Sequence, residues 1–117
     1  MDKVDSLQIQ VSVGDFCDRH SILDIKRSNG LKVDQELQQY ETGKPQDINY
    51  MHYFEILKAI NSQLWDLEDK KRKYVSRYST DESDTAYMIT QLNDLRHETK
   101  KRLDAYFNCD ITEKKSH

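Results

Sequence analysis

The stretch YMHYFEILKAINSQLWDL, residues 50–67, decides the fold of this chain. Its large side chains recur at alternating spacings of three and four, at Tyr50, Tyr53, Leu57, Ile60, Leu64 and Leu67. A stripe of this period lies along one face of an amphipathic helix. The stripe continues through Lys71 to Tyr74 and Tyr78, and Asp47 suits the N-cap position before it. The sequence therefore predicts one long helix in the middle of the chain.

A second long helix is expected after a polar hinge at residues 79–83. It should run from about Asp84 to Phe107, and Asn108 suits the left-handed position that ends a helix. Its expected buried face consists of Met88, Leu92, Leu95, Thr99, Leu103 and Tyr106. Two long helices joined by a short hinge predict an antiparallel helical hairpin.

Another helix is expected ahead of the hairpin. Residues 1–11 are expected to form an extended arm, because polar and apolar side chains alternate at its end. Ser12 and Asp15 then have the spacing of a helix N-cap. They predict a helix from Val13 to Ser28, and Asn29-Gly30 is a typical stop.

The remaining segments are shorter. Residues 33–41 predict a short helix, residues 42–45 a turn, and residues 109–117 a polar tail. Three Gly and one Pro leave few places where a helix would break. The sequence therefore predicts an all-α protein with a single domain over residues 1–117, a small bundle made of the hairpin and the N-terminal helix.

The composition predicts a thin hydrophobic core. Only 36% of the 117 residues are hydrophobic and 33% are charged. A helical protein with so few apolar residues is often completed by a second copy, so we expect a homodimer or a higher homo-oligomer. The long helix is the expected contact, since a line of tyrosines along it suits a bundle or dimer core: Tyr50, Tyr53, Tyr74 and Tyr78.

Charge and targeting signals exclude several classes of partner. The net charge is −3, and acidic residues flank both basic clusters, at residues 70–73 and 100–102, so no duplex nucleic acid is expected. No apolar run approaches membrane-spanning length, and the first residues do not resemble a secretion signal. Cys17 and Cys109 do not form a disulfide framework. We therefore expect a cytoplasmic protein with reduced thiols.

Charged residues on the core-facing arc of the first helix are the most unusual feature of the sequence. At about 100° per residue, Asp18, Arg19 and Lys26 fall within the arc of the apolar residues. Those apolar residues are Phe16, Ile22, Leu23 and Ile25. A charge in such a place must be paired, reach solvent or hold a ligand.

One hypothesis is an anion pocket between the helices. Its cations would be Arg19, Lys26, Arg72, Arg96 and Lys100. Asp18, Glu68 and Asn93 would orient these cations, and Trp65 would form a stacking wall for a nucleobase or sugar ring. The alternative is that the same acids and bases pair with one another in a structural network. The sequence leaves both open.

Metal and nucleophilic chemistry have little support. Cys17 and His20 share a face, but no paired metal-ligand spacing is present, and Cys17 is expected to be a small buried hydrophobe. No cofactor is expected. A four-carboxylate magnesium site has only Asp66-x-x-Asp69 to build on. Ser21 follows His20, but adjacent positions of a helix point apart, so this serine and histidine do not form a nucleophile–base pair. A small enzyme of the chorismate mutase type, which needs only cations around a dianion, stays open.

Three stretches of the chain resemble a known family when taken together. They are Val11-Ser12-Val13-Gly14-Asp15 with Asp18-Arg19 and Ile22-Leu23-Asp24-Ile25-Lys26; Asn61 with Leu64-Trp65-Asp66-Leu67-Glu68-Asp69 and Arg72; and Asn93-Asp94, Arg96, Lys100-Lys101-Arg102, Glu113 and Lys115-Ser116. The chain is similar to a family of short bacterial and phage proteins of unassigned function, some associated with polysaccharide-biosynthesis proteins. The resemblance is weakest over residues 27–60. His117 stands where the family usually has Tyr. The resemblance implies an all-helical fold and brings no known activity.

These observations together predict a non-enzymatic binder of a phosphorylated small molecule. The ligand would be a nucleotide, a nucleotide sugar or a nucleotide-derived signal, and in a phage setting such a binder would sequester a host signal. The rival hypotheses are a protein–protein adaptor with a purely structural charge network, and a small lyase- or mutase-like enzyme.

Overall fold

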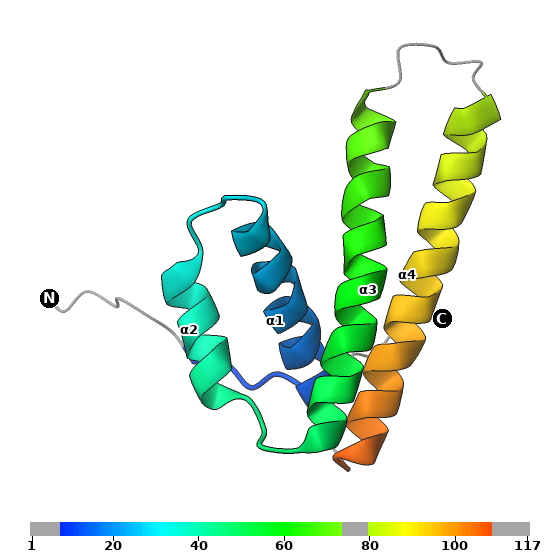
Figure 1. Cartoon of the computed structure of the whole chain (residues 1–117). Helices are drawn as coiled ribbons and strands as arrows, with labels where there is room; N and C mark the ends of the chain where they lie inside the picture. Colours follow the sequence, from blue (N-terminus) through cyan, green and yellow to red (C-terminus); the bar gives the residue numbers. More distant parts are fainter. Residues whose placement is uncertain (1–7, 74–79, 109–117) are drawn as a thin grey trace, which may run out of the picture.

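Four helices make up the regular structure of the protein, in a computed structural model that describes residues 8–73 and 80–108 (Figure 1). They are α1 (Val13–Ser28), α2 (Asp34–Gly43), α3 (Ile48–Arg72) and α4 (Thr80–Tyr106). These two described ranges contain no strand, so the all-α prediction is confirmed. None of the four helices, as far as they are described, combines the length and apolar character needed to cross a membrane.

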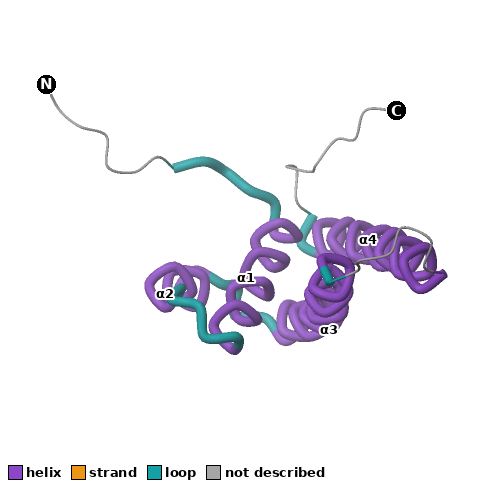
Figure 2. Tube along the Cα trace, turned by 90° about the horizontal axis from the view of Figure 1, so that it is seen from above, coloured by secondary structure: helices purple, strands orange, loops and turns teal. Residues whose placement is uncertain are grey.

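The helices form a small bundle around α1. The long helices α3 and α4 lie side by side and antiparallel, as the predicted hairpin requires (Figure 1). Helix α1 packs against both of them, and α2 packs against α1 on the side away from the hairpin (Figure 2). Helix α1 is therefore the element that contacts all the others.

Helix ends follow the capping residues of the sequence. The Ser12 hydroxyl accepts a hydrogen bond from the Asp15 backbone N–H at 3.0 Å, and the Asp47 carboxylate accepts one from the Asn49 N–H at 2.7 Å. Gly30, with φ of 84°, follows the end of α1, and Asn108, with φ of 52°, follows α4. All four residues act where they were predicted to act, because caps depend on local chemistry alone.

Two predicted boundaries were wrong. Helix α2 runs on to Gly43, so the first two residues of the predicted turn at 42–45 are helical. Helix α4 begins at Thr80 rather than Asp84, so most of the predicted hinge belongs to the helix. Polarity alone does not stop a helix: residues 79–84 contain neither Gly nor Pro, and Glu82 lies in the first turn, where a carboxylate is favourable.

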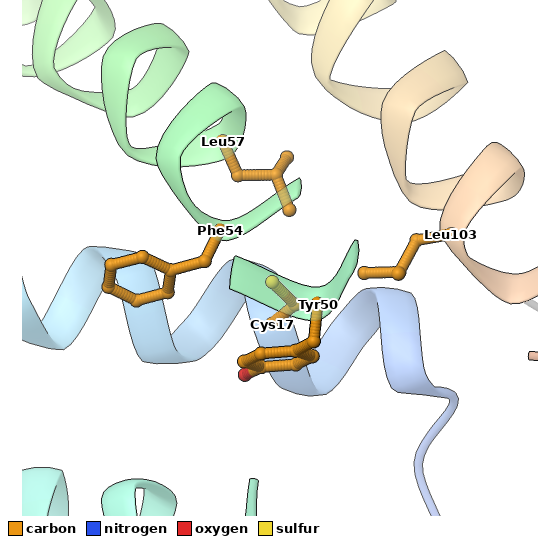
Figure 3. Packing of buried hydrophobic residues seen from close by; sticks show 5 residues of the cluster. All are labelled: Cys17, Tyr50, Phe54, Leu57 and Leu103. Atoms are coloured by element: carbon orange, nitrogen blue, oxygen red, sulfur yellow. The ribbon is translucent and has the colours of Figure 1, made fainter. Parts of the chain in front are cut away.

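The main core joins α1, α3 and α4. It contains Cys17, Tyr50, Phe54, Leu57 and Leu103, each at most 5% exposed (Figure 3). Full burial of a leucine or phenylalanine side chain stabilises a fold by about 1.5–3 kcal/mol. Burial also raises the pKa of the Cys17 thiol to about 12, so this thiol stays protonated at neutral pH and packs as the small hydrophobe that was predicted.

A smaller core lies farther along the hairpin and shows which face of α4 is buried. It contains Ile60, Leu64 and Ile89. The predicted face of α4 was wrong in part, because Met88, Leu95 and Tyr106 are about half exposed. The face that packs consists of residues separated by alternately four and three positions: Thr85, Ile89, Leu92, Arg96, Thr99 and Leu103. Because three of these residues are polar, the stripe is not visible as a line of apolar residues. A prediction that is displaced by one residue selects a face about 100° away on the helix.

The stripe on α3 was right over most of its length. Phe54 and Asn61 are buried together with the predicted Leu57 and Leu64, whereas Leu67 is half-buried and Lys71 is exposed. Helix α3 includes Lys71 and ends at Arg72. Tyr74 and Tyr78 lie outside the described residues, as do residues 1–7 of the predicted arm and the tail at 109–117.

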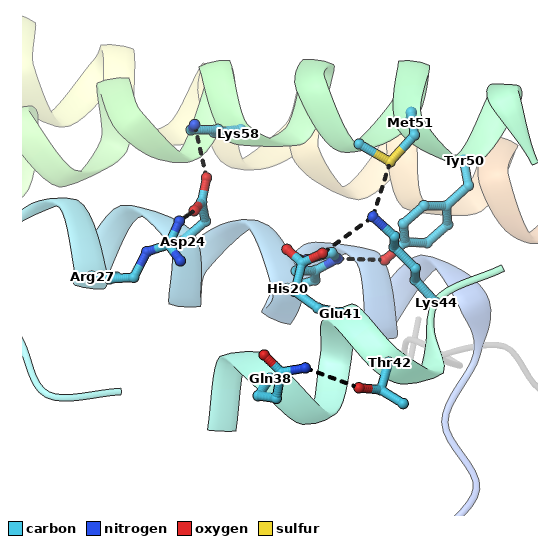
Figure 4. Close-up of polar contacts among 10 residues, drawn as sticks. All are labelled: His20, Asp24, Arg27, Gln38, Glu41, Thr42, Lys44, Tyr50, Met51 and Lys58. Atoms are coloured by element: carbon cyan, nitrogen blue, oxygen red, sulfur yellow. Dashed lines mark hydrogen bonds and ion pairs between the residues drawn. The ribbon is translucent and has the colours of Figure 1, made fainter. Parts of the chain in front are cut away.

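A buried histidine attaches α2 to the rest of the bundle. His20 is fully buried; its Nε2 donates to a Glu41 carboxylate oxygen at 2.8 Å, and its Nδ1 lies 2.9 Å from the Tyr50 hydroxyl (Figure 4). The His20 hydrogen bond, followed by Lys44, lowers the pKa of Glu41. This contact therefore adds stability above the ordinary carboxyl pKa of 4.5, and that stability is lost as the pH falls through the lowered value.

Candidate functional site

A buried polar junction joins α1, α3 and α4, and we call it the Asp18 junction. Asp18 is 3% exposed. Arg96 donates to both of its carboxylate oxygens, from Nε at 2.9 Å and from Nη2 at 2.6 Å, and Asn61 donates to Oδ1 at 2.9 Å. Ser21 completes the junction, because its hydroxyl accepts from Asn61 and donates to the Asp18 carbonyl oxygen. Each of the three helices therefore contributes at least one side chain to the Asp18 junction.

The Asp18 junction fixes the position of Arg96. A two-point pair with a carboxylate holds the plane of a guanidinium, which one hydrogen bond does not do. The Arg96 side chain keeps 30% of its surface exposed, whereas that of Asp18 keeps 4%. Arg96 therefore reaches from the interior to the surface, and its Nη1 lies 3.5 Å from the Asn93 side-chain oxygen. For Asp18 and Arg96, the predicted pairing of acid and base is present.

A cleft of about 510 Å³ opens beside the Asp18 junction, and we call it the Trp65 cleft. Helix α1 contributes Ile22 to its lining, and α4 contributes Asn93 and Arg96. Helix α3 provides the longest wall, with Asn61, Leu64, Trp65, Glu68 and Arg72. This volume lies within the range of about 300–1,000 Å³ that is usual for small-molecule sites.

The side chains of the Trp65 cleft offer three kinds of contact. The half-buried indole of Trp65 and the neighbouring aliphatic chains suit the face of a ring. Glu68 forms no ion pair with any described residue, so its carboxylate can accept hydrogen bonds from a ligand hydroxyl or amine. Arg72 pairs with Asp69 rather than with Glu68, at a long 3.7 Å, and 69% of its side chain is exposed. Its guanidinium can therefore turn toward an anion.

A second hollow, of about 480 Å³, lies on the other side of Arg96, and we call it the Arg19 hollow. Residues 9–12 form one wall. Its charged residues are Asp15, Asp18, Arg19, Arg96 and Lys100. Lys100 lies 2.7 Å from Asp15, and Arg96 is paired with Asp18. Arg19 is exposed and forms no ion pair with a described residue, so the hollow carries one uncompensated positive charge.

The nine residues predicted to share one pocket are therefore divided. Trp65, Glu68, Arg72 and Asn93 line the Trp65 cleft, and Asp18, Arg19 and Lys100 line the Arg19 hollow. Arg96 lines both, and so does Ile22. Lys26, one turn beyond Ile22, lines neither. Neither of these hollows therefore brings all five predicted cations together, and the paired Arg96 is the cation that lines both.

Several residues of the site were not among those predicted. Asn61 and Ser21 complete the Asp18 junction. Outside the site, Asp104 of α4 accepts a hydrogen bond of 2.6 Å from the Gly14 N–H of α1. Asp104 is 5% exposed, and its burial raises the pKa of its carboxyl group. The sequence holds one signal for Asn61: it is a polar residue one helical turn before Trp65, directly after the core residue Ile60. Nothing local distinguishes Asp104 from an exposed acid.

The side chains that the structure describes form no metal centre. Within residues 8–73 and 80–108, no three histidine, cysteine, aspartate or glutamate side chains are placed to hold one ion. The buried His20 is bound to Glu41 and Tyr50 and faces neither hollow. The groups that can contact a ligand in the two hollows are therefore aromatic, carboxylate, amide and guanidinium groups.

Comparisons with known proteins add no relative. No protein-family model, no curated protein and no solved structure matches this chain. The resemblance described from the sequence consequently stays a prediction, and the function has to be inferred from the side chains of the two hollows.

Proposed function

We propose that this protein binds a phosphorylated small molecule in the Trp65 cleft and releases it unchanged. The ring of the ligand rests on Trp65, and its phosphate meets Arg72 and the outer side of Arg96. The observation that carries this proposal is the composition of the cleft, in which one indole, one carboxylate without an ionic partner among the described residues and two guanidinium groups line the same 510 Å³. A nucleotide has a partner in this set for each of its parts.

The Asp18 junction supports the proposal by holding Arg96 in place before a ligand arrives. Binding is weakened by the entropy lost when flexible side chains become ordered, about 0.5–1.5 kcal/mol for each one. Asp18 and Asn61 are already bonded at 2.6–2.9 Å, so Arg96 loses little further freedom. A structural network and a binding site are thus compatible here, because the same arginine serves both.

Binding is favoured over catalysis by what lines the cleft. The described residues of its lining include no serine, cysteine or histidine, so they supply no nucleophile and no imidazole base. A mutase that stabilises a dianion needs several unpaired cations around it. Here Asp18 already neutralises Arg96 at 2.6 Å, which counts against the enzyme hypothesis.

A protein–protein adaptor is the second candidate, and one observation favours it. Helix α4 exposes Tyr87, Met88 and Leu95 to 66%, 48% and 52%. Exposed apolar side chains close together on one helix are typical of a contact with another protein. This surface is also where we propose that two copies associate, in place of the tyrosine line on α3, since Tyr50 is fully buried within one chain.

Thermal denaturation with and without nucleotide tests the proposed binding. Nucleotides should raise the melting temperature of the wild type, because a ligand at 100 times its Kd adds about 2.7 kcal/mol to the free energy of unfolding. For a domain of this size that corresponds to roughly 10 °C. Arg72→Gln should remove most of the shift, since a hydrogen bond to a charged group contributes about 1.5–3 kcal/mol.

Arg102→Gln is the matched control. Arg102 is 71% exposed and pairs with Glu98 along its own helix, much as Arg72 is 69% exposed and pairs with Asp69. It lines neither hollow, so its variant should keep the full shift. Equal shifts in the two variants would show that the anion does not bind in the Trp65 cleft. If no nucleotide or sugar phosphate raised the melting temperature, the adaptor hypothesis would be favoured.

A further inference from the structure

The Trp65 cleft and the Arg19 hollow share two lining residues, so one ligand can extend from one into the other. Ile22 and Arg96 each line both the Trp65 cleft and the Arg19 hollow. We infer that the ligand has a ring at each end of a diphosphate, with one ring in the Trp65 cleft, the diphosphate across Arg96 and the second ring in the Arg19 hollow. This inference rests on the proposed function and specifies its ligand class.

The sizes of the hollows support a ligand with two parts. Each hollow, at about 510 and 480 Å³, has the volume of a complete small-molecule site. A single mononucleotide in the Trp65 cleft would leave the second hollow to water. A molecule that crosses Arg96 fills both, and it gains the second set of contacts without a second loss of translational freedom.

The distribution of charge favours a diphosphate over a monophosphate. At the crossing point, the Arg96 charge is balanced by Asp18 at 2.6 Å, and in the Arg19 hollow the Lys100 charge is balanced by Asp15 at 2.7 Å. The cations with weaker or no ionic partners, Arg72 and Arg19, therefore lie on opposite sides of Arg96. A diphosphate spreads its charge over two groups along the line between these arginines, whereas a monophosphate concentrates its charge at one point.

The far wall of the Arg19 hollow suits a sugar-like ring. It is formed by the segment from Ile9 to Ser12, whose residues include two aliphatic ones and Gln10. Aliphatic surface packs against the face of a sugar, and an amide both donates to and accepts from its hydroxyls. The stacking group of the site, Trp65, lies in the other hollow, so the flat base is placed there.

Isothermal titration with two matched ligand series tests the inference. The first series is AMP, ADP and ADP-ribose, and the second is UMP, UDP and UDP-glucose. The two-ring ligands are ADP-ribose and UDP-glucose. In the series whose base fits Trp65, the two-ring ligand should bind about 10–100-fold more tightly than the monophosphate. Arg19→Gln should weaken the two-ring member about tenfold and change the monophosphate less than about twofold.

Arg27→Gln serves as the control, because Arg27 is an exposed arginine of the same helix and lines neither hollow. It should leave all six affinities unchanged. If a monophosphate binds as tightly as the two-ring ligand and Arg19→Gln changes neither, the inference is overturned while the proposed function stands. If no member of either series binds, both are overturned together.

Discussion

Replacing Asp18 with alanine is expected to lower the free energy of unfolding by about 3 kcal/mol, as measured by urea denaturation. The variant leaves the Arg96 guanidinium without its carboxylate and removes an acceptor from the buried Asn61 amide. Breaking a buried ion pair by removing one partner costs about 3–5 kcal/mol. We expect the lower end of that range, because 30% of the Arg96 side chain reaches water.

A double-mutant cycle separates the ion pair from other effects of the substitution. Arg96→Met replaces the guanidinium by an apolar chain, so the double variant no longer buries an unpaired charge. It should be at least about 1 kcal/mol more stable than the sum of the two single effects predicts. Asp94→Ala, at an exposed acid of α4, should change stability by less than about 0.5 kcal/mol. Additive effects at Asp18 and Arg96 would show that the two side chains are not coupled.

Replacing Gly14 with alanine should cost about 2–3 kcal/mol of stability, even though alanine is the better helix former. A Cβ atom at this position would lie 2.5 Å from the Lys100 backbone oxygen and 2.9 Å from the Asp104 carboxylate. Helix α1 would have to move away from α4. That movement would stretch the 2.6 Å hydrogen bond from the Gly14 N–H to Asp104.

The same substitution at another helical glycine provides the control. A Cβ on Gly43 would meet only the Phe16 ring, at an ordinary 3.6 Å, so Gly43→Ala should be neutral or slightly stabilising. Thermal and urea denaturation of both variants distinguish the two positions. Equal stability of the two would mean that α1 and α4 do not approach as closely as the structure has them.

The parts of the fold that depend on local chemistry could be predicted from the sequence. Helix α1 has its predicted bounds, because Ser12 caps one end and Gly30 follows the other. The buried face of α4 could not be predicted from apolar residues alone. Two threonines and Arg96 occupy positions of the packed stripe, and their burial depends on partners in α1 and α3 that lie far away in the sequence.

Only part of the site could be predicted in its residues, and its arrangement could not. Trp65, Glu68, Arg72, Asn93 and Arg96 do line one cleft, as the spacing of residues on two facing helices suggests. The sequence does not show which acid pairs with which base. Asp18 binds Arg96, 78 positions away, and this pairing separates the Arg19 hollow from the Trp65 cleft. Such a choice depends on the packing of α1 against the hairpin, which no local pattern encodes.

The fluorescence of Trp65 provides the most direct test of ligand binding in the cleft. Trp65 is the single tryptophan of the chain, so its emission reports on the Trp65 cleft alone. Excited at the red edge of its absorption, where nucleotides do not absorb, the wild type should show saturable quenching by ADP-ribose or UDP-glucose. The quenching should weaken in Arg72→Gln and persist in Arg102→Gln. Emission that stays unchanged at millimolar concentrations of both ligands would contradict the proposed site.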